Sequence, residues 1–220
     1  MCSNTLARVD VYELEEKLYQ AGYDIIAGVD EVGRGSLAGP LVAAAVILRK
    51  GERIEGIRDS KTLNKKRRAE FFELIVKRAL CWTISWVEAK TIDEISIDQS
   101  NLLVMKRSVL LLEPQPQVVL SDSYRLPGLE IMHIPVLHGD SRSASIAAAS
   151  IMAKETRDRI MINRDRAFPG YFFAQHKGYG TELHRQAITR LGACSIHRLS
   201  YGPFSRRNKR GPHLLARFRT

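Results

Sequence analysis

Two apolar segments near the start of the chain are joined by so few residues that their relative direction is fixed. The segments DIIAGVD (24–30) and LVAAAVILR (41–49) are both predicted to be β-strands, and the link between them includes the glycine-rich stretch GRGSLAGP (33–40). A parallel pair would need a crossover of a dozen or more residues, usually a helix. The sequence therefore predicts an antiparallel hairpin, with Asp30 at the end of its first strand.

The rest of the chain alternates between helical and extended patterns. Helices are predicted over 11–22, 64–80, 97–113, 141–168 and 181–192, and further strands over 81–89, 117–122 and 130–138. Asn64 is a suitable N-cap for the second helix, and Gly192 is a suitable end for the last one. A three-stranded meander followed by strands separated by helices predicts an α/β fold, with a central mixed sheet flanked by helices.

Composition narrows the class of protein. The chain has 220 residues, 45% of them hydrophobic, which is enough for one substantial domain. Its three cysteines, Cys2, Cys81 and Cys194, are far apart and form no C-x-x-C motif, which is typical of a reducing compartment. The N-terminus lacks the apolar core of a signal peptide, and the longest apolar run, LVAAAVIL (41–48), is too short to cross a bilayer. We expect a cytoplasmic protein without membrane association.

The positive charge is concentrated at the C-terminal end. The net charge is +10, and after Glu182 nine basic residues follow with no acidic one. Basic clusters attract phosphate irrespective of sequence, so this end is predicted to bind a polyanion such as nucleic acid. The alternative is a tail that is merely solvated, and charge alone does not separate nucleic acid from an acidic membrane.

Acidic residues stand where the predicted elements end. Asp30 ends the first strand, Asp122 ends the fourth, and Asp140 precedes the long helix. Acids are common in turns, but several converging at the edge of a sheet indicate a site, since α/β folds bind ligands there. Glu31 adds a difficulty, because adjacent strand residues point to opposite faces. Either the Gly33–Gly35 turn breaks the pleat, or Glu31 serves a second ion.

Other catalytic systems are not supported by the sequence. His133 and His138 lack a serine or cysteine partner in a nucleophile-elbow context, and the chain has no H-E-x-x-H, G-x-G-x-x-G or Walker motif. Carboxylates without histidine or cysteine ligands suit hard cations, namely Mg²⁺ or Mn²⁺. The residues therefore predict metal-assisted hydrolysis of phosphodiesters, with a basic surface that holds the polymer.

Five segments occur in an order that is specific to one family. They are GVDEVGRGSLAGPLVAAAVIL, DSKTLNKKRR, GDSRSASIAAASIMAKETRDRIM, FAQHKGYGTELH and IHRLSYGP. Together they resemble bacterial ribonuclease HII, the type 2 ribonuclease H family, from about residue 23 to 204. The resemblance implies a ribonuclease H-like fold, cleavage of RNA in RNA–DNA hybrids with divalent metal, and incision on the 5′ side of single ribonucleotides embedded in duplex DNA.

The resemblance also assigns roles to individual residues. The catalytic acids that would hold two Mn²⁺ or Mg²⁺ ions are Asp30, Glu31, Asp122 and Asp140. The turn that contacts the ribonucleotide 2′-hydroxyls is formed by Gly33, Arg34 and Gly35. Tyr179, in HKGYG, matches a tyrosine that stacks on the sugar of the following nucleotide. Lys61 is a candidate substrate-binding residue near a helix start, although a solvated charge is an equal alternative.

Two positions depart from the usual family pattern. Ser123 stands where the third acid is usually followed by glycine or alanine, and His138 stands where lysine usually precedes the Gly-Asp pair. Asp158 lies about five helical turns beyond Asp140, which favours a structural role. The histidines expected to be scaffold hydrogen-bonding groups are His176, His184 and His197.

The predicted organisation is a helical extension (1–22), a ribonuclease H type 2 catalytic domain (23–204) and a basic tail (205–220). The expected partners are RNA–DNA hybrids and ribonucleotide-containing duplex DNA, bound by a monomer. Two alternatives stay open: another ribonuclease H-like nuclease such as a junction resolvase, which would cut pure DNA duplexes, and a non-catalytic nucleic-acid-binding module, which would cut nothing.

Overall fold

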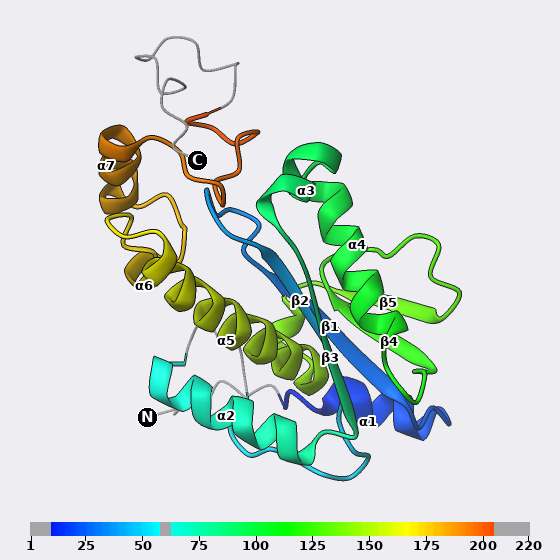
Figure 1. Cartoon of the computed structure of the whole chain (residues 1–220). Helices are drawn as coiled ribbons and strands as arrows, with labels where there is room; N and C mark the ends of the chain where they lie inside the picture. Colours follow the sequence, from blue (N-terminus) through cyan, green and yellow to red (C-terminus); the bar gives the residue numbers. More distant parts are fainter. Residues whose placement is uncertain (1–9, 58–62, 205–220) are drawn as a thin grey trace, which may run out of the picture.

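The computed structural model describes residues 10–57 and 63–204, and its centre is one twisted sheet of five strands in the order β3-β2-β1-β4-β5 (Figure 1). The strands are β1 (Ile26–Val32), β2 (Leu41–Ile47), β3 (Cys81–Val87), β4 (Val118–Asp122) and β5 (Met132–Val136). β1, β2 and β3 form an antiparallel meander, whereas β4 and β5 continue the sheet parallel to β1. The predicted hairpin and the mixed sheet are confirmed.

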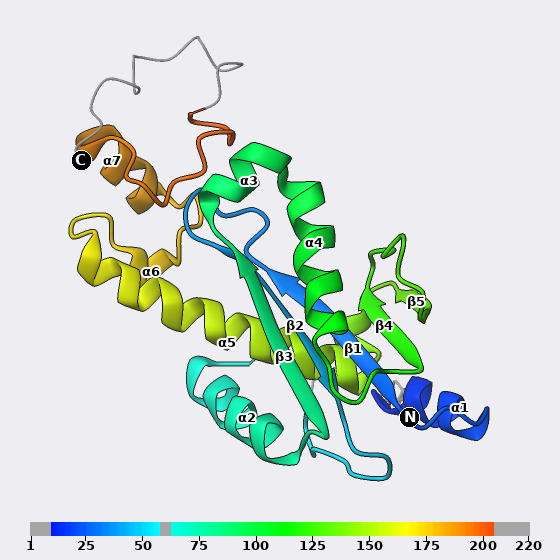
Figure 2. The same cartoon turned by 45° about the vertical axis from the view of Figure 1, so that its right-hand side comes forward.

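Helices cover both faces of the sheet (Figure 2). They are α1 (Glu13–Gln20), α2 (Lys65–Arg78), α3 (Ala89–Ile95), α4 (Ile97–Leu110), α5 (Ala144–Ala167), α6 (Phe173–His176) and α7 (Glu182–Leu191). One core lies between the sheet and α2 and α5, where Val42, Ala44 and Val46 point. A second core lies under α4 on the opposite face, where Ala27 and Val29 point.

The long helix α5 packs unusually close to β1, because both surfaces consist of small residues. A Cβ atom at Gly28 would lie 2.1 Å from the backbone carbon of Ser145, so no larger residue fits there. The first half of α5 contributes buried alanines such as Ala147 and Ala148 to the core between this helix and the sheet. This close packing aligns the N-terminal half of α5 with the strand that carries Asp30.

The described part of the N-terminal segment caps α5. Glu15 in α1 is buried, and its Oε1 accepts hydrogen bonds from the Ser143 hydroxyl (2.6 Å) and the Ser145 backbone N–H (2.9 Å). The Val11 carbonyl accepts from the Ala144 N–H at 2.8 Å. Since the first N–H groups of a helix have no partner within the helix, a carboxylate there stabilises the start of α5.

Some predicted boundaries are wrong. β1 continues to Val32 because β2 pairs with it beyond the acidic pair, so Asp30 does not end the strand. The helix predicted over 97–113 ends at Leu110, and the short α3 and α6 were not predicted, since they contain too few residues to show a period. A membrane-crossing helix is not found among residues 10–57 and 63–204.

Candidate active site

Asp30 and Asp122 become neighbours through the pairing of two parallel strands. The register of β1 and β4 pairs Gly28 with Leu120 and Val29 with Ser121, so one further step places Asp30 beside Asp122. These two acids are 92 residues apart in the chain, and only the parallel pairing brings them together. Asp122 ends β4, as predicted.

Asp140 approaches the same edge of the sheet through a short 3-10 turn. The turn, η2 (Gly139–Ser141), follows β5, and its Gly139 N–H donates to Asp122 Oδ1 at 2.8 Å. Asp140, the next residue, is buried with 5% of its surface exposed. Asp140 precedes the long helix, as predicted, but α5 begins at Ala144 and not at 141.

Asp30 is buried and lies next to other negative charges. Burial raises the pKa of its carboxyl well above the usual value, and the charges of Glu31 and Asp122 raise it further. Two hydrogen bonds oppose this effect, one from the hydroxyl of Ser150 in α5 and one from the Glu31 backbone N–H at 2.8 Å. A cation bound between these carboxylates would relieve the repulsion and keep them ionised.

Glu31 occupies the opposite face of β1. The register with β2 runs without interruption from Ala27 to Val32, so the strand stays regular through the acidic pair. The possibility that the following turn breaks the pleat is therefore wrong. Glu31 points to the side of the sheet where α4 lies, and its charge acts on Arg34.

The oxygen donors fit a hard divalent cation, although they are not gathered as a set of three. Within the described ranges, no group of three or more His, Cys, Asp or Glu side chains is arranged to hold one ion. Asp30 and Asp122 lie side by side on parallel strands and form a candidate pair of ligands. Both donors are carboxylates, the ligands that Mg²⁺ and Mn²⁺ prefer. The burial of Asp30 beside Asp122 and Glu31 favours a bound cation, which would offset the repulsion between their charges.

Both departures from the family pattern fall at left-handed backbone positions. Ser123 has φ +61° and His138 has φ +53°, a region where glycine is normally favoured. The Ser123 hydroxyl donates to Asp122 Oδ1 at 3.2 Å, so this serine adds a hydrogen bond to a predicted ligand. The His138 side chain is exposed.

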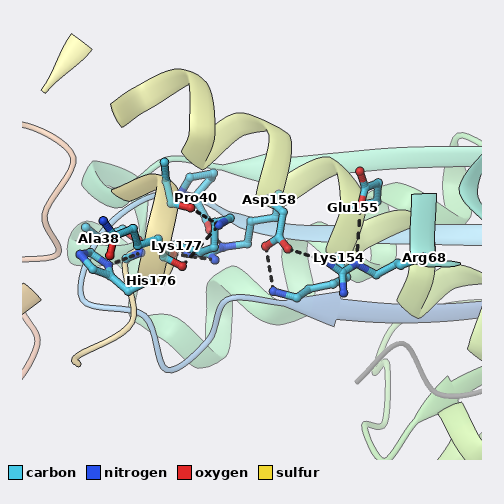
Figure 3. Close-up of polar contacts among 12 residues, drawn as sticks. Ala38, Pro40, Arg68, Lys154, Glu155, Asp158, His176 and Lys177 are labelled. Carbon is cyan, nitrogen blue, oxygen red and sulfur yellow. Dashed lines mark hydrogen bonds and ion pairs between the residues drawn. The ribbon is translucent and has the colours of Figure 1, made fainter. Parts of the chain in front are cut away.

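The turn after β1 is held by two buried arginines. Arg198 Nη1 donates to the carbonyls of Gly33 (2.7 Å) and Arg34 (2.9 Å), and its Nε and Nη2 donate to the Gly39 carbonyl. Arg157 donates to the Ala38, Pro40 and Lys177 carbonyls (Figure 3). Burial lowers the pKa of Arg157 to about 10, so its guanidinium stays charged at neutral pH.

The three residues of the predicted substrate turn differ in their surroundings. Gly33 has φ +100°, and a Cβ atom there would lie 2.3 Å from Arg157 Nε. Gly35 is exposed, and a Cβ there would meet no atom of the described chain within 4 Å. The Arg34 guanidinium donates to Asp98 Oδ1 at 2.9 Å and lies over the ring of Tyr124, 5.0 Å from its centroid.

Tyr179 lies beside this turn. Ser36 and Tyr179 form an isolated antiparallel bridge, and the Leu37 N–H donates to the Gly178 carbonyl at 2.8 Å. The Tyr179 ring is half-buried, with Lys154 Nζ 5.8 Å and the Arg157 guanidinium carbon 5.3 Å from its centroid. The fold thus juxtaposes the two segments that were predicted to contact a ribonucleotide, whereas Lys61 lies outside the described residues.

Asp158 has a structural role, as expected. Its carboxylate accepts from Arg68 Nη2 at 2.9 Å and Lys154 Nζ at 2.8 Å, and Arg68 also approaches Glu155 at 3.4 Å (Figure 3). Arg68 is in α2 and the other three residues are in α5. This buried group of charges joins the two helices and is separate from the acids at the sheet edge.

A serine–histidine contact near the acids does not form a nucleophile. The Ser121 hydroxyl donates to the Tyr124 carbonyl at 2.5 Å, so its proton is not directed at His133. His133 Nδ1 accepts from the Leu126 N–H at 3.4 Å, which leaves Nε2–H as the donor to Ser121 at 2.7 Å. His133 therefore cannot act as a base toward this serine.

Three residues that support the site were missed from sequence. They are Ser150, Arg157 and Arg198. The sequence offers a signal for the two arginines only. Arg157 lies inside the apolar pattern of α5, and Arg198 directly follows Ile196 and His197. An arginine in such surroundings is expected to be buried, and a buried arginine needs several carbonyl or carboxylate partners.

A mixed five-stranded sheet with acids side by side near the C-terminal ends of two parallel strands is typical of nucleases with the ribonuclease H-like fold. The family model described as ribonuclease HII matches residues 27–203. Ribonuclease HII from Caldicellulosiruptor bescii is 45% identical over 190 residues, which cover 86% of this chain and 92% of that protein. The chain belongs to the ribonuclease HII family, and it is an endoribonuclease with ribonuclease H activity on RNA–DNA hybrids.

Solved structures support the same fold. Ribonuclease H2 from Pyrococcus horikoshii has a TM-score of 0.69 at 24% identity, covering 85% of this chain and 100% of that one. The Bst ribonuclease HIII complex with Mn²⁺ has a TM-score of 0.63 at 19% identity, covering 94% of this chain and 77% of that one. At these identities the likeness carries the fold, and the Mn²⁺ belongs to the HIII structure.

Proposed function

We propose that this endoribonuclease also incises duplex DNA on the 5′ side of a single embedded ribonucleotide, and that it uses two divalent ions, Mn²⁺ or Mg²⁺. The observation that supports recognition of a single ribonucleotide is the bridge between Ser36 and Tyr179. Through this bridge an aromatic ring lies beside the Gly33–Gly35 turn. The turn directly follows β1, the strand that carries Asp30 and Glu31. One ribose could therefore contact the turn while the next sugar contacts the ring.

The residues that would hold the ions are Asp30, Glu31, Asp122 and Asp140. Ions bound there would activate the attacking water and stabilise the leaving 3′ oxygen. Glu31 lies on the other face of β1 from Asp30, which favours different ions for these two acids. Ser150 and the Gly139 N–H orient the carboxylates of Asp30 and Asp122 by hydrogen bonds.

The chain's own groups would provide recognition. Gly35 leaves open space on the turn, so a sugar could approach the backbone there. The 2′-hydroxyl both donates and accepts hydrogen bonds, which lets backbone groups distinguish RNA from DNA. Tyr179 would then stack on the following sugar, and Lys154 with Arg157 would place positive charge behind its ring.

The decisive experiment compares three duplexes of equal length: all DNA, DNA with one ribonucleotide, and an RNA–DNA hybrid. With Mg²⁺ or Mn²⁺ we expect cleavage of the hybrid and a single cut 5′ of the ribonucleotide, and an intact DNA duplex. Asp30→Asn should abolish both cuts. Asp24→Asn is the matched control, because Asp24 is exposed at the opposite end of β1 and pairs with Lys50.

Two results would contradict the proposal. Cleavage of the all-DNA duplex would favour a junction-type nuclease of the same fold. An uncut single-ribonucleotide duplex, with the hybrid cleaved normally, would restrict the enzyme to continuous hybrids.

Tyr179→Ala tests the recognition step separately. Stacking on nucleic acid contributes about 1–3 kcal/mol, so cleavage at a single ribonucleotide should fall roughly tenfold to a hundredfold. The loss on the continuous hybrid should be smaller, since its next sugar carries a 2′-hydroxyl. Equal losses together with a clear fall in melting temperature would indicate that Tyr179 only packs.

A further inference from the structure

Three histidines meet beneath the Tyr179 loop, away from the acids. His176, His184 and His197 are all buried, and they come from α6, α7 and the segment after α7. His176 stacks on His184 with 4.3 Å between ring centroids, and Phe173 packs edge-on against both rings. Histidines that are this enclosed by aromatic rings are expected to be neutral, because burial opposes the charged form.

The hydrogen bonds fix one tautomer for the pair His197 and His184. Three groups of Cys194 lie near His197 Nδ1, namely the backbone N–H at 2.9 Å, Sγ at 3.1 Å and the carbonyl oxygen at 3.3 Å. The shortest of these contacts is with the N–H, which can only donate, so we assign the proton of this ring to Nε2. Nε2–H of His197 then donates to Nε2 of His184 at 3.1 Å. This leaves the proton of His184 on Nδ1, which donates to the Tyr179 carbonyl at 3.0 Å.

His176 supports the same loop at Gly178. Its Nδ1 accepts from the Gly178 N–H at 3.1 Å, and its Nε2–H donates to the Tyr171 carbonyl at 2.8 Å. The imidazoles therefore fix the N–H of Gly178 and the carbonyl of Tyr179. Burial lowers the pKa of His184 and of His197 to about 4, so both stay neutral at physiological pH.

The residue after His197 holds the other substrate-facing segment. Arg198 donates from its side chain to the Gly33 carbonyl and from its backbone N–H to the Leu37 carbonyl at 2.9 Å. Two consecutive residues thus connect to the two segments that would contact a ribonucleotide. A displacement at 197–198 would change the separation between the Gly33–Gly35 turn and Tyr179.

We propose that the His197–His184 pair is a positioning relay that sets the place of Tyr179 relative to the turn, and thereby the preference for a single ribonucleotide over a continuous hybrid. This inference rests on the proposed role of Tyr179. His184 and His197 do not touch the substrate in this arrangement, and they act through the Tyr179 carbonyl.

The test compares His184→Leu with His184→Asn. Leucine keeps the volume but removes the donor, whereas the amide nitrogen of asparagine takes the place of Nδ1 and still donates to the Tyr179 carbonyl. In His184→Leu the Tyr179 carbonyl would keep its hydrogen bond from the Thr181 N–H at 2.8 Å and lose the one that ties the loop to α7. We expect His184→Leu to lower the ratio of single-ribonucleotide to hybrid cleavage about tenfold. His184→Asn should recover most of that ratio even if its melting temperature is lowered.

Tyr171→Phe is the matched control. It removes a hydrogen bond of similar burial in the same cluster, from the Tyr171 hydroxyl to the Gly192 carbonyl at 2.9 Å, without altering the relay. Its melting temperature should fall, while its cleavage ratio should equal that of the wild type.

An NMR spectrum of the imidazole nitrogens in the wild-type protein at pH 7 gives a readout independent of activity. We expect His197 protonated at Nε2 and His184 at Nδ1, and any other pair of tautomers overturns the relay. If Tyr179→Ala changes the cleavage ratio but His184→Leu does not, the relay is refuted and the role of Tyr179 stands. If Tyr179→Ala leaves the ratio unchanged, the role of Tyr179 fails, and the positioning inference falls with it even where the tautomers are as expected.

Discussion

Arg198→Met tests whether the turn after β1 must be clamped for cleavage. In the structure Arg198 is fully buried, and its guanidinium donates to the carbonyls of Gly33, Arg34 and Gly39. Methionine fills much of the volume but donates nothing. In this variant the Gly33 carbonyl would keep its hydrogen bond from the Ser36 N–H, and the Arg34 carbonyl would keep its hydrogen bond from the Tyr201 hydroxyl.

The Gly39 carbonyl has no other partner among the hydrogen bonds of the described chain, so it carries the largest penalty. A buried carbonyl without a partner costs about 1–3 kcal/mol, and the two weakened carbonyls add to this. Removing a buried charge next to Arg157 offsets part of the loss. We expect a net destabilisation of about 3 kcal/mol, which corresponds to a fall of roughly 6–12 °C in melting temperature for a domain of this size.

The assay combines thermal unfolding without metal with cleavage of both substrates well below either melting temperature. We expect Arg198→Met to reduce cleavage of both substrates at least about tenfold, because the turn loses its fixed position. Arg190→Met is the matched control, since Arg190 also donates to a backbone carbonyl, that of Gly170, but is exposed. Wild-type cleavage by a folded Arg198→Met protein would refute the clamp.

Three further predictions concern charge. Asp30→Asn and Asp122→Asn should abolish cleavage, and near-normal turnover in either variant would contradict the metal-site assignment. Neither variant should melt at a lower temperature than the metal-free wild type, because each substitution removes the repulsion between these two carboxylates. Because burial lowers the pKa of His184 and His197 to about 4, their neutral forms should stabilise the fold above about pH 6.5, and that stability should be lost as the pH falls toward 4. The loss is at most about 3 kcal/mol per histidine, and urea unfolding at several pH values should show a shallower slope in His197→Gln. Deleting residues 206–220 should weaken duplex binding and flatten its salt dependence without moving the cut, and an unchanged salt slope would mean that the tail is only solvated.

The sequence alone determined the features that depend on local pattern and chain length. The hairpin followed from the short link between 24–30 and 41–49, and the start of α2 followed from the Asn64 cap, whose side chain accepts from the Arg67 N–H. Gly192 ends α7 with φ +78°, as its position after the last periodic residue predicted. The ordered motifs also identified the family, because they are fixed by residue type and spacing.

Only the tertiary structure decided how distant segments meet. The end of β1 at Val32 depends on its pairing with β2, and the opposite placement of Asp30 and Glu31 depends on that regular register. The bridge between Ser36 and Tyr179 joins segments more than 140 residues apart, which no local pattern encodes. The partners of the buried Arg198 guanidinium cannot be read from the sequence, because they are backbone carbonyls, and every residue type presents the same carbonyl.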